Sequence, residues 1–283
     1  MASFDVYSPE KVSDLMEYIK NAPANTKYLA GGTDLVIHIR EKKVSPELVI
    51  DLSRINELQY IKEEENEIKI GAVTSFTTIE ESPVIQKYAF CLAQAASGVG
   101  SVQIRNTGTI GGNVANASPA ADSIPALVAL GANLKIEGPE GSRMEKIEDF
   151  LVGVEKTILK PREYISEITI PKYGEGYKSG FAKLGRRKAL AIARINLAVI
   201  VKLEGHIVKE MRIGLGAVGT TAYRPYAAEK ALEGKKLDNA LIEEMAELLS
   251  KVVEEKIGAR ASMPYKRAAI KGLVFDVGEL LLK

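Results

Sequence analysis

The segment at residues 107–116, ThrGlyThrIleGlyGlyAsnValAlaAsn, restricts the fold of this chain more than any other stretch. Its ten residues include three glycines, two threonines and two asparagines, and a stretch compatible with a helix follows. Such a composition offers hydrogen-bond donors and close backbone approach instead of apolar packing. We interpret it as a phosphate-binding loop, and the alternative is a surface Ω-loop that binds nothing.

A second glycine segment, AlaGlyGlyThrAsp at 30–34, lies between a predicted strand at 27–30 and a predicted buried element that begins at Leu35. Paired glycines permit positive φ, so successive amides can form a nest for phosphate oxygens, to which Thr33 can add a hydroxyl donor. Taken alone, such a turn is more often a plain connection. Two such segments in one domain can clamp opposite sides of a pyrophosphate.

A third glycine motif, GlyLeuGlyAlaValGly at 214–219, has the spacing G-x-G-x-x-G of a dinucleotide-binding turn. That turn requires a helix to begin within the glycines, so that its amides face the pyrophosphate. Pro225 follows too soon for a continuous helix from Gly219. The motif is therefore interpreted as the glycine-rich end of a strand.

Composition excludes several classes of protein. The chain has 38 basic and 37 acidic residues, so no charge excess predicts nucleic-acid or membrane-surface binding. A single cysteine, Cys91, rules out an intrachain disulfide, a thiolate-held iron–sulfur cluster and a cysteine-rich zinc site, and it is predicted to be a small buried residue. His38 and His206 have no neighbouring ligand pair. No apolar run is long enough for a membrane span, and we expect a cytoplasmic protein.

The hydrophobic pattern predicts an α+β fold. Ser8 and Pro9 are typical of a helix start, and the helix is expected to run to about Lys20. A small β-turn-α-β unit should follow at 27–52, and an antiparallel hairpin around 60–70 then makes the sheet mixed. A helical region is expected at about 84–97.

The pattern changes after Pro171. Long strands are predicted at 178–184, 192–203 and 207–218, and an amphipathic helix at 238–257. We therefore expect an N-terminal domain at 1–174 with a mixed or antiparallel sheet and two parts, about 1–55 and 56–174. A smaller α+β domain at 175–283 should contain an antiparallel sheet and helices.

Four motifs together carry a family resemblance: AlaGlyGlyThrAspLeu at 30–35, GlnIleArgAsnThrGlyThrIleGlyGlyAsn at 103–113, AlaSerProAlaAlaAsp at 117–122 and PheAlaLysLeuGlyArgArg at 181–187. In this set and this order, over nearly the whole chain, the sequence closely resembles the flavoprotein subunits of molybdenum hydroxylases. Xanthine dehydrogenase, carbon monoxide dehydrogenase and nicotinate dehydrogenase belong to that family. The resemblance implies an FAD-binding fold and a smaller domain that closes over the flavin.

The resemblance also implies which residues contact FAD. It places Asp122 at the adenosine half of the cofactor, and Ile165 and Lys183 near the edges of the flavin. From the sequence alone, Asp122 is equally well explained as a helix N-cap. No residue is assigned a catalytic role. The implied FAD-binding residues are Leu29, Ala30, Gly31, Gly32, Thr33, Asp34, Thr109, Gly111, Gly112, Asn113, Asn116, Asp122, Ile165 and Lys183.

The function implied by the resemblance is electron transfer. A large molybdopterin subunit would oxidise the substrate, and a small subunit with two [2Fe–2S] clusters would pass electrons to FAD on this chain and on to NAD⁺ or another acceptor. The rival interpretations are a stand-alone FAD-dependent oxidoreductase and an interaction protein without cofactor. Arg105, Arg186 and Arg187 are either solvated surface charges or a basic group near an anionic cofactor or a cluster subunit.

Overall fold

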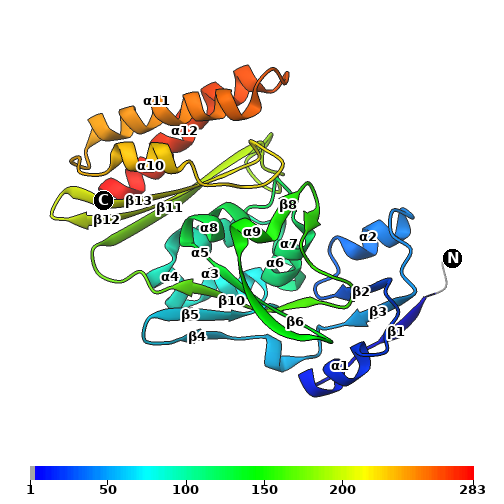
Figure 1. Ribbon diagram of the computed structural model, residues 1–283. Helices are drawn as coiled ribbons and strands as arrows, with labels where there is room; N and C mark the ends of the chain where they lie inside the picture. Colours follow the sequence, from blue (N-terminus) through cyan, green and yellow to red (C-terminus); the bar gives the residue numbers. More distant parts are fainter. Residues whose placement is uncertain (1–3) are drawn as a thin grey trace.

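The computed structural model describes residues 4–283, and Figure 1 shows how the chain is arranged. Its first part is a small parallel sheet in the order β1-β3-β2. The strands are β1 (Asp5–Tyr7), β2 (Thr26–Leu29) and β3 (Leu48–Asp51). The β2–β3 pair confirms the predicted β-turn-α-β unit.

The two helices of this part differ from expectation. Helix α1 (Val12–Ile19) begins later than Ser8 and has no side-chain cap; instead the Val12 N–H donates to the Glu57 carboxylate, 2.6 Å away. Helix α2 (Leu35–Arg40) has no buried residue, so the buried element expected there is a half-exposed surface helix.

The core of this first part is completed by residues from much later in the chain. Leu15 and Ile19 of α1 pack in a cluster that also contains Tyr164. The Tyr28 hydroxyl donates to the Arg162 carbonyl at 2.7 Å, and the Arg162 guanidinium donates to the Lys20 carbonyl at 2.9 Å. The parallel sheet is thereby fixed to the second part.

The second part is an antiparallel sheet in the order β4-β5-β10-β6-β7. The β4–β5 pair confirms the predicted hairpin. Parallel and antiparallel strands thus lie in separate sheets. The strands are β4 (Ile61–Glu63), β5 (Glu67–Gly71), β6 (Asn133–Gly138), β7 (Gly141–Lys146) and β10 (Tyr164–Pro171), with a short pair β8 (Leu151–Gly153) and β9 (Lys156–Thr157) beside them.

Short helices accompany this sheet. All residues of α8 are buried, and its C-terminal cap Gly131 adopts a φ of +67°, as expected for a glycine cap. Cys91 is fully buried in the same core, and burial raises the pKa of its thiol to about 12. The elements are η1 (Asn56–Leu58), α3 (Phe76–Glu81), α4 (Pro83–Tyr88), α5 (Phe90–Ser97), α6 (Val102–Thr107), α7 (Ile110–Asn116), α8 (Ser123–Leu130) and α9 (Ile147–Phe150).

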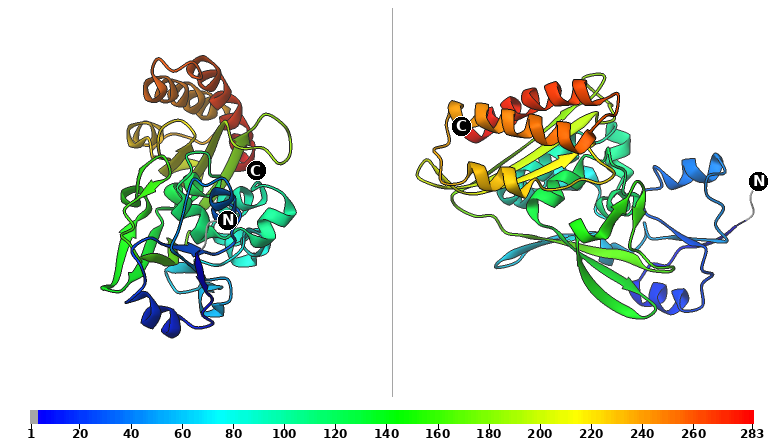
Figure 2. Two further views of the ribbon diagram at one scale, coloured as in Figure 1. Left: turned by 90° about the vertical axis from the view of Figure 1, so that its right-hand side faces the viewer. Right: turned by 45° about the horizontal axis from the view of Figure 1, so that its top comes forward.

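The third part is an antiparallel sheet of β11 (Tyr177–Leu184), β12 (Ile195–Glu204) and β13 (Ile207–Gly216). Helices α10 (Tyr226–Leu232), α11 (Asn239–Ile257) and α12 (Met263–Leu282) cover one face of it, and α5 and α8 approach from the other side (Figures 1 and 2). The predicted α+β class is confirmed. No helix within residues 4–283 is long and apolar enough to cross a membrane.

The first three residues of the glycine motif at 214–219 form the end of β13, as interpreted from the sequence, and the other three follow the strand. A Cβ atom on Gly214 would lie 1.9 Å from the Pro125 carbonyl oxygen of α8. The missing side chain thus allows the third sheet to approach α8 closely.

Candidate functional site

The first glycine segment leaves backbone donors unpaired. It follows β2 directly, and Gly32 adopts a φ of +69°, which favours glycine. Within residues 4–283, the N–H groups of Gly31, Gly32 and Thr33 donate to no other residue. All three residues are partly exposed. Unpaired amides in a positive-φ turn are the donor arrangement that anionic oxygens accept.

The second glycine segment is organised differently. From Ile110 onward it is helix α7, so these residues form neither the predicted loop nor the alternative Ω-loop. Thr109 caps the helix, and its Oγ1 accepts from the Gly112 N–H at 3.2 Å. The Gly111 N–H donates to the Ala72 carbonyl at 2.9 Å. The first amides of this segment are therefore already paired within the chain.

The two segments touch each other. A Cβ atom on Gly31 would lie 2.0 Å from the Thr107 carbonyl oxygen, a distance that no side chain can occupy. A Cβ atom on Gly112 would lie 3.9 Å from the Ala30 Cβ. Gly112 is itself exposed. Backbone contact at Gly31 thus brings together two segments that lie far apart in the sequence.

Lys183 and Asp122 form a second group at the junction with the third sheet. The Lys183 Nζ donates to Asp122 Oδ2 at 2.6 Å, to the Gly98 carbonyl at 2.6 Å and to the Ala191 carbonyl at 3.2 Å. Asp122 precedes α8, but its carboxylate makes no capping hydrogen bond. Burial raises the pKa of the Asp122 carboxyl, and the opposing effects of Lys183 and Asn196 are smaller.

Asn196 is the residue that the sequence analysis missed. It lies on β12, is fully buried, and its Nδ2 donates to Asp122 Oδ1 at 3.2 Å and to the Ala121 carbonyl at 3.1 Å. Gly216 faces it across the β12–β13 pair, where a Cβ atom would lie 2.0 Å from Asn196 Oδ1. The sequence held one signal for this residue: Asn196 is a polar side chain within the otherwise apolar run 195–201. A polar group in a buried strand needs a hydrogen-bond partner.

The remaining predicted residues are spread around these two groups. Asn113 Oδ1 accepts from the Ser123 hydroxyl at 2.7 Å, which connects α7 to the start of α8 beside Asp122. Asn116 is half-buried at the end of α7. Ile165 is different, because its side chain is 4% exposed and packs in the core of the five-stranded sheet.

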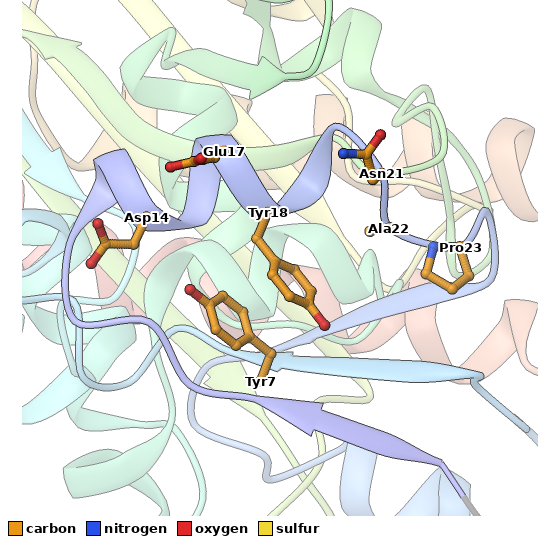
Figure 3. Close-up of a pocket in the computed structure, with 7 residues that line it drawn as sticks. All are labelled: Tyr7, Asp14, Glu17, Tyr18, Asn21, Ala22 and Pro23. Carbon is orange, nitrogen blue, oxygen red and sulfur yellow. The ribbon is translucent and has the colours of Figure 1, made fainter.

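A surface pocket of about 570 Å³ lies elsewhere, between β1 and α1 (Figure 3). The Tyr7 and Tyr18 rings stack there with centroids 3.8 Å apart and an angle of 14° between their planes. None of the predicted site residues contributes to it, so it is separate from the glycine segments. Its lining residues are Tyr7, Asp14, Glu17, Tyr18, Asn21, Ala22 and Pro23.

Two family models match the chain. Residues 2–173 match the FAD binding domain in molybdopterin dehydrogenase, and residues 181–279 match the CO dehydrogenase flavoprotein C-terminal domain. The first match alone covers more than half of the 283 residues. The chain thus carries an FAD-binding domain of this type.

Relatives and solved structures agree with these matches. The chain is 35% identical to the nicotinate dehydrogenase FAD-subunit of Eubacterium barkeri, over 96% of this chain and 94% of that one. It is 31% identical to the glyceraldehyde dehydrogenase medium chain of Sulfolobus acidocaldarius, over 95% of both. A carbon monoxide dehydrogenase structure from Hydrogenophaga pseudoflava superposes with a TM-score of 0.89 at 31% identity, covering 98% of this chain and 96% of that one. The chain therefore belongs to the FAD-binding subunits of the molybdenum hydroxylase family.

Proposed function

We propose that this chain holds FAD across its two glycine segments and serves as the electron-transfer subunit of a larger complex. The observation that carries the proposal is the contact between the segments: Gly31, the first of the three residues with unpaired amides, packs against the Thr107 carbonyl, and Ala30 lies beside the exposed Gly112. This cradle fits a pyrophosphate, because it combines free donors with a surface that lacks side chains.

Different groups of this chain would contact different parts of the cofactor. The amides of residues 30–34 would donate to the phosphate oxygens, and the glycines of 109–113 would allow the cofactor to approach α7 closely. Lys183 and Asp122 would lie beside the cofactor as a charge pair held in place by Asn196. Leu29 and Asn116 would line the cofactor less directly, and Ile165, buried in the core, would support the site from behind. Bound FAD supplies the exchange between one-electron and two-electron transfer.

The partners follow from the family. Relatives of this chain are named FAD-subunit and medium chain, which are names of components. We infer a large molybdopterin subunit where the substrate is oxidised and a small subunit with [2Fe–2S] clusters that deliver single electrons. The electron acceptor would be NAD⁺ or another two-electron carrier. Residues 1–174 would form the FAD-binding domain, in two parts of about 1–55 and 56–174, and residues 175–283 the domain that contributes Lys183.

The test is anaerobic mixing of the FAD-loaded chain with xanthine and, separately, with NADH, while the visible flavin absorbance is followed. We expect no bleaching with xanthine, because substrate oxidation belongs to the partner, and bleaching with NADH. Bleaching by xanthine alone would mean a stand-alone oxidoreductase and overturn the subunit assignment. No bleaching with NADH would exclude the nicotinamide acceptor. Chromatography of the released cofactor should give FAD and no FMN.

A further inference from the structure

The loop that follows β13, residues 217–219, begins with a residue in a strained conformation. Ala217 adopts a φ of +58°, a left-handed value that favours glycine and costs free energy for other residues. Ala117, at the end of α7, adopts a φ of +49°. Such values persist only where the surroundings hold the backbone, and they concentrate at functional sites. The contacts of Ala217 therefore indicate what the strain serves.

Both backbone groups of Ala217 are bonded to other parts of the chain. Its N–H donates to the Pro119 carbonyl at 2.8 Å, and its carbonyl accepts from the Lys266 ammonium. Lys266 lies in the first turn of α12. Pro119 belongs to the segment 117–122, which ends at Asp122, a residue assigned to FAD in the proposed function. Ala217 thus connects α12 of the third part to a segment of the proposed cofactor site.

The end of β13 packs closely against the same site. A Cβ atom on Gly216 would lie 2.0 Å from Asn196 Oδ1, and the Asn196 Nδ2 donates to Asp122 Oδ1 at 3.2 Å. On the other side of Ala217, Val218 is fully buried in the core between the third sheet and its helices. The loop is therefore enclosed on both sides, and a movement of Ala217 would displace residues around Asp122.

Two cations hold the loop from the side of α11 and α12. The Lys266 ammonium donates to the Ala217 carbonyl, and the Arg260 guanidinium donates to the Val218 carbonyl at 2.9 Å. Among the described residues, neither cation forms an ion pair with a carboxylate. Burial and the charges of Arg260 and Arg194 lower the pKa of Lys266. An ammonium in this position is unfavourable by itself, so the bond to Ala217 explains its placement.

We propose that Lys266 is a positioning residue for the cofactor: through Ala217 it holds the segment 117–122 in the shape that binds FAD. The inference rests on the proposed function, in which this segment contacts FAD. Lys266 need not touch the cofactor, because the Ala217 N–H transmits its effect to the Pro119 carbonyl. Helix α12 of the third part thus controls how tightly the second part binds FAD.

The alternative role for Lys266 is purely structural. In that case the ammonium only fixes the first turn of α12 to the loop. Its loss would then lower the stability of the chain and leave the affinity and the spectrum of bound FAD unchanged. The properties of the bound flavin therefore distinguish the two roles.

The test compares Lys266→Met with Lys251→Met in the full chain. Lys251 is an exposed lysine of α11 without an ion pair among the described residues, so its variant controls for the loss of one positive charge. In calorimetric titration, Lys266→Met should bind FAD about tenfold more weakly and Lys251→Met as the wild type does. At saturating FAD, the visible circular dichroism of the flavin should change only in Lys266→Met.

Hydrogen exchange of the FAD-free chain tests the connection itself. In Lys266→Met, peptides that contain residues 117–122 and 217–219 should exchange faster, and peptides from the buried strand β12 should exchange as in the wild type. Arg260→Met is a second variant, at an exposed residue. It should weaken FAD binding about threefold, because the bond of Lys266 to Ala217 stays in place.

Three outcomes would overturn the proposal: wild-type FAD affinity in Lys266→Met, unchanged exchange of residues 117–122, or a difference in affinity that disappears at high salt. The last would mean that Lys266 only attracts the anionic cofactor by its charge. If the wild-type chain takes up no FAD, the proposed function is overturned. The exchange measurements then still decide whether Lys266 holds the segment.

Discussion

The two glycine segments look alike in sequence and differ in structure. In the first, the amides of Gly31, Gly32 and Thr33 have no partner among the residues that the structure describes, and all three residues are partly exposed. In the second, the Gly112 amide is paired to the Thr109 cap, and the start of α7 is bonded to the turn that follows β5. Glycine content alone therefore does not identify a donor. The first segment is suited to binding phosphate and the second to supporting a surface that the ligand can approach.

The largest effect should come from separating the segments. Gly31→Val places a side chain where the Thr107 carbonyl lies 2.0 Å away, so the backbones must move apart. We expect loss of FAD and an unfolding free energy lower by about 3 kcal/mol. Flavin content and urea denaturation measure both. Gly174→Ala is the control, since no heavy atom lies within 4 Å of its Cβ position. Full FAD occupancy in Gly31→Val would refute the contact between Gly31 and Thr107.

A smaller loss of stability is expected from removing Asn196, which holds Asp122 in place. Asn196→Ala leaves the buried Asp122 carboxylate without one donor, which should lower the unfolding free energy by about 2 kcal/mol. Asn21→Ala, at an exposed position, should change it little. If both variants unfold at the same denaturant concentration, Asn196 does not support this site.

A substitution at Gly112 tests whether the cofactor lies against the surface of the second segment. Gly112 has no positive φ, so the substitution acts through space: a Cβ atom would lie 2.8 Å from Thr109 Oγ1 and next to Ala30. Gly112→Val should weaken FAD binding about tenfold, which is about 1.4 kcal/mol. Ala115→Val, at an exposed position on the same helix, carries the same β-branched residue as a control. Equal flavin retention in the two variants would argue against cofactor contact at Gly112.

The two threonines give the most direct comparison. Thr109→Val removes the cap of α7 and should lower the unfolding free energy by about 1 kcal/mol. Thr33→Val removes a hydroxyl that has no hydrogen-bond partner within residues 4–283, so stability should hold while FAD affinity falls about fivefold, or about 1 kcal/mol. Calorimetric FAD titration and thermal unfolding of both variants decide this. If Thr33→Val instead lowered stability and Thr109→Val instead lowered FAD affinity, the first segment would be the structural support and the second the phosphate donor.

The smallest expected effect is a pH dependence at Asp122. Burial raises the pKa of its carboxyl in the folded state above the ordinary value of about 3.9. Its contribution to stability is therefore present below that ordinary pKa and is lost as the pH rises through the raised folded pKa. The unfolding free energy of wild type minus that of Asp122→Asn should fall across this window. A constant difference would contradict the raised pKa.

Local patterns in the sequence predicted much of the fold. The alternation of apolar and polar residues predicted the hairpin and the long strands after Pro171. Short-range signals determine such elements, because the residues that form them are neighbours in the chain. The glycine segments were found for the same reason.

Features set by distant partners were not predicted. Helix α7 contains two adjacent glycines, which disfavour a helix, yet the Thr109 cap and bonds to the turn after β5 stabilise it. Asn196 acquires its role from Asp122, 74 positions away in the sequence. Helix α1 begins where Glu57 accepts its first amide. Composition cannot reveal these contacts, since each requires the folded arrangement.

The hydrogen bonds that fix the first part of the chain also determine when this part can fold during synthesis. Tyr28 and Lys20 pair with Arg162, and Tyr164 completes the core around Leu15. On the ribosome, the N-terminal residues must therefore wait for β10 to emerge before they reach their final shape. We expect nascent chains stalled before β10 to be cut by protease in the first part, and chains stalled well beyond it to resist. Equal cleavage of both would show that the N-terminal part folds unaided.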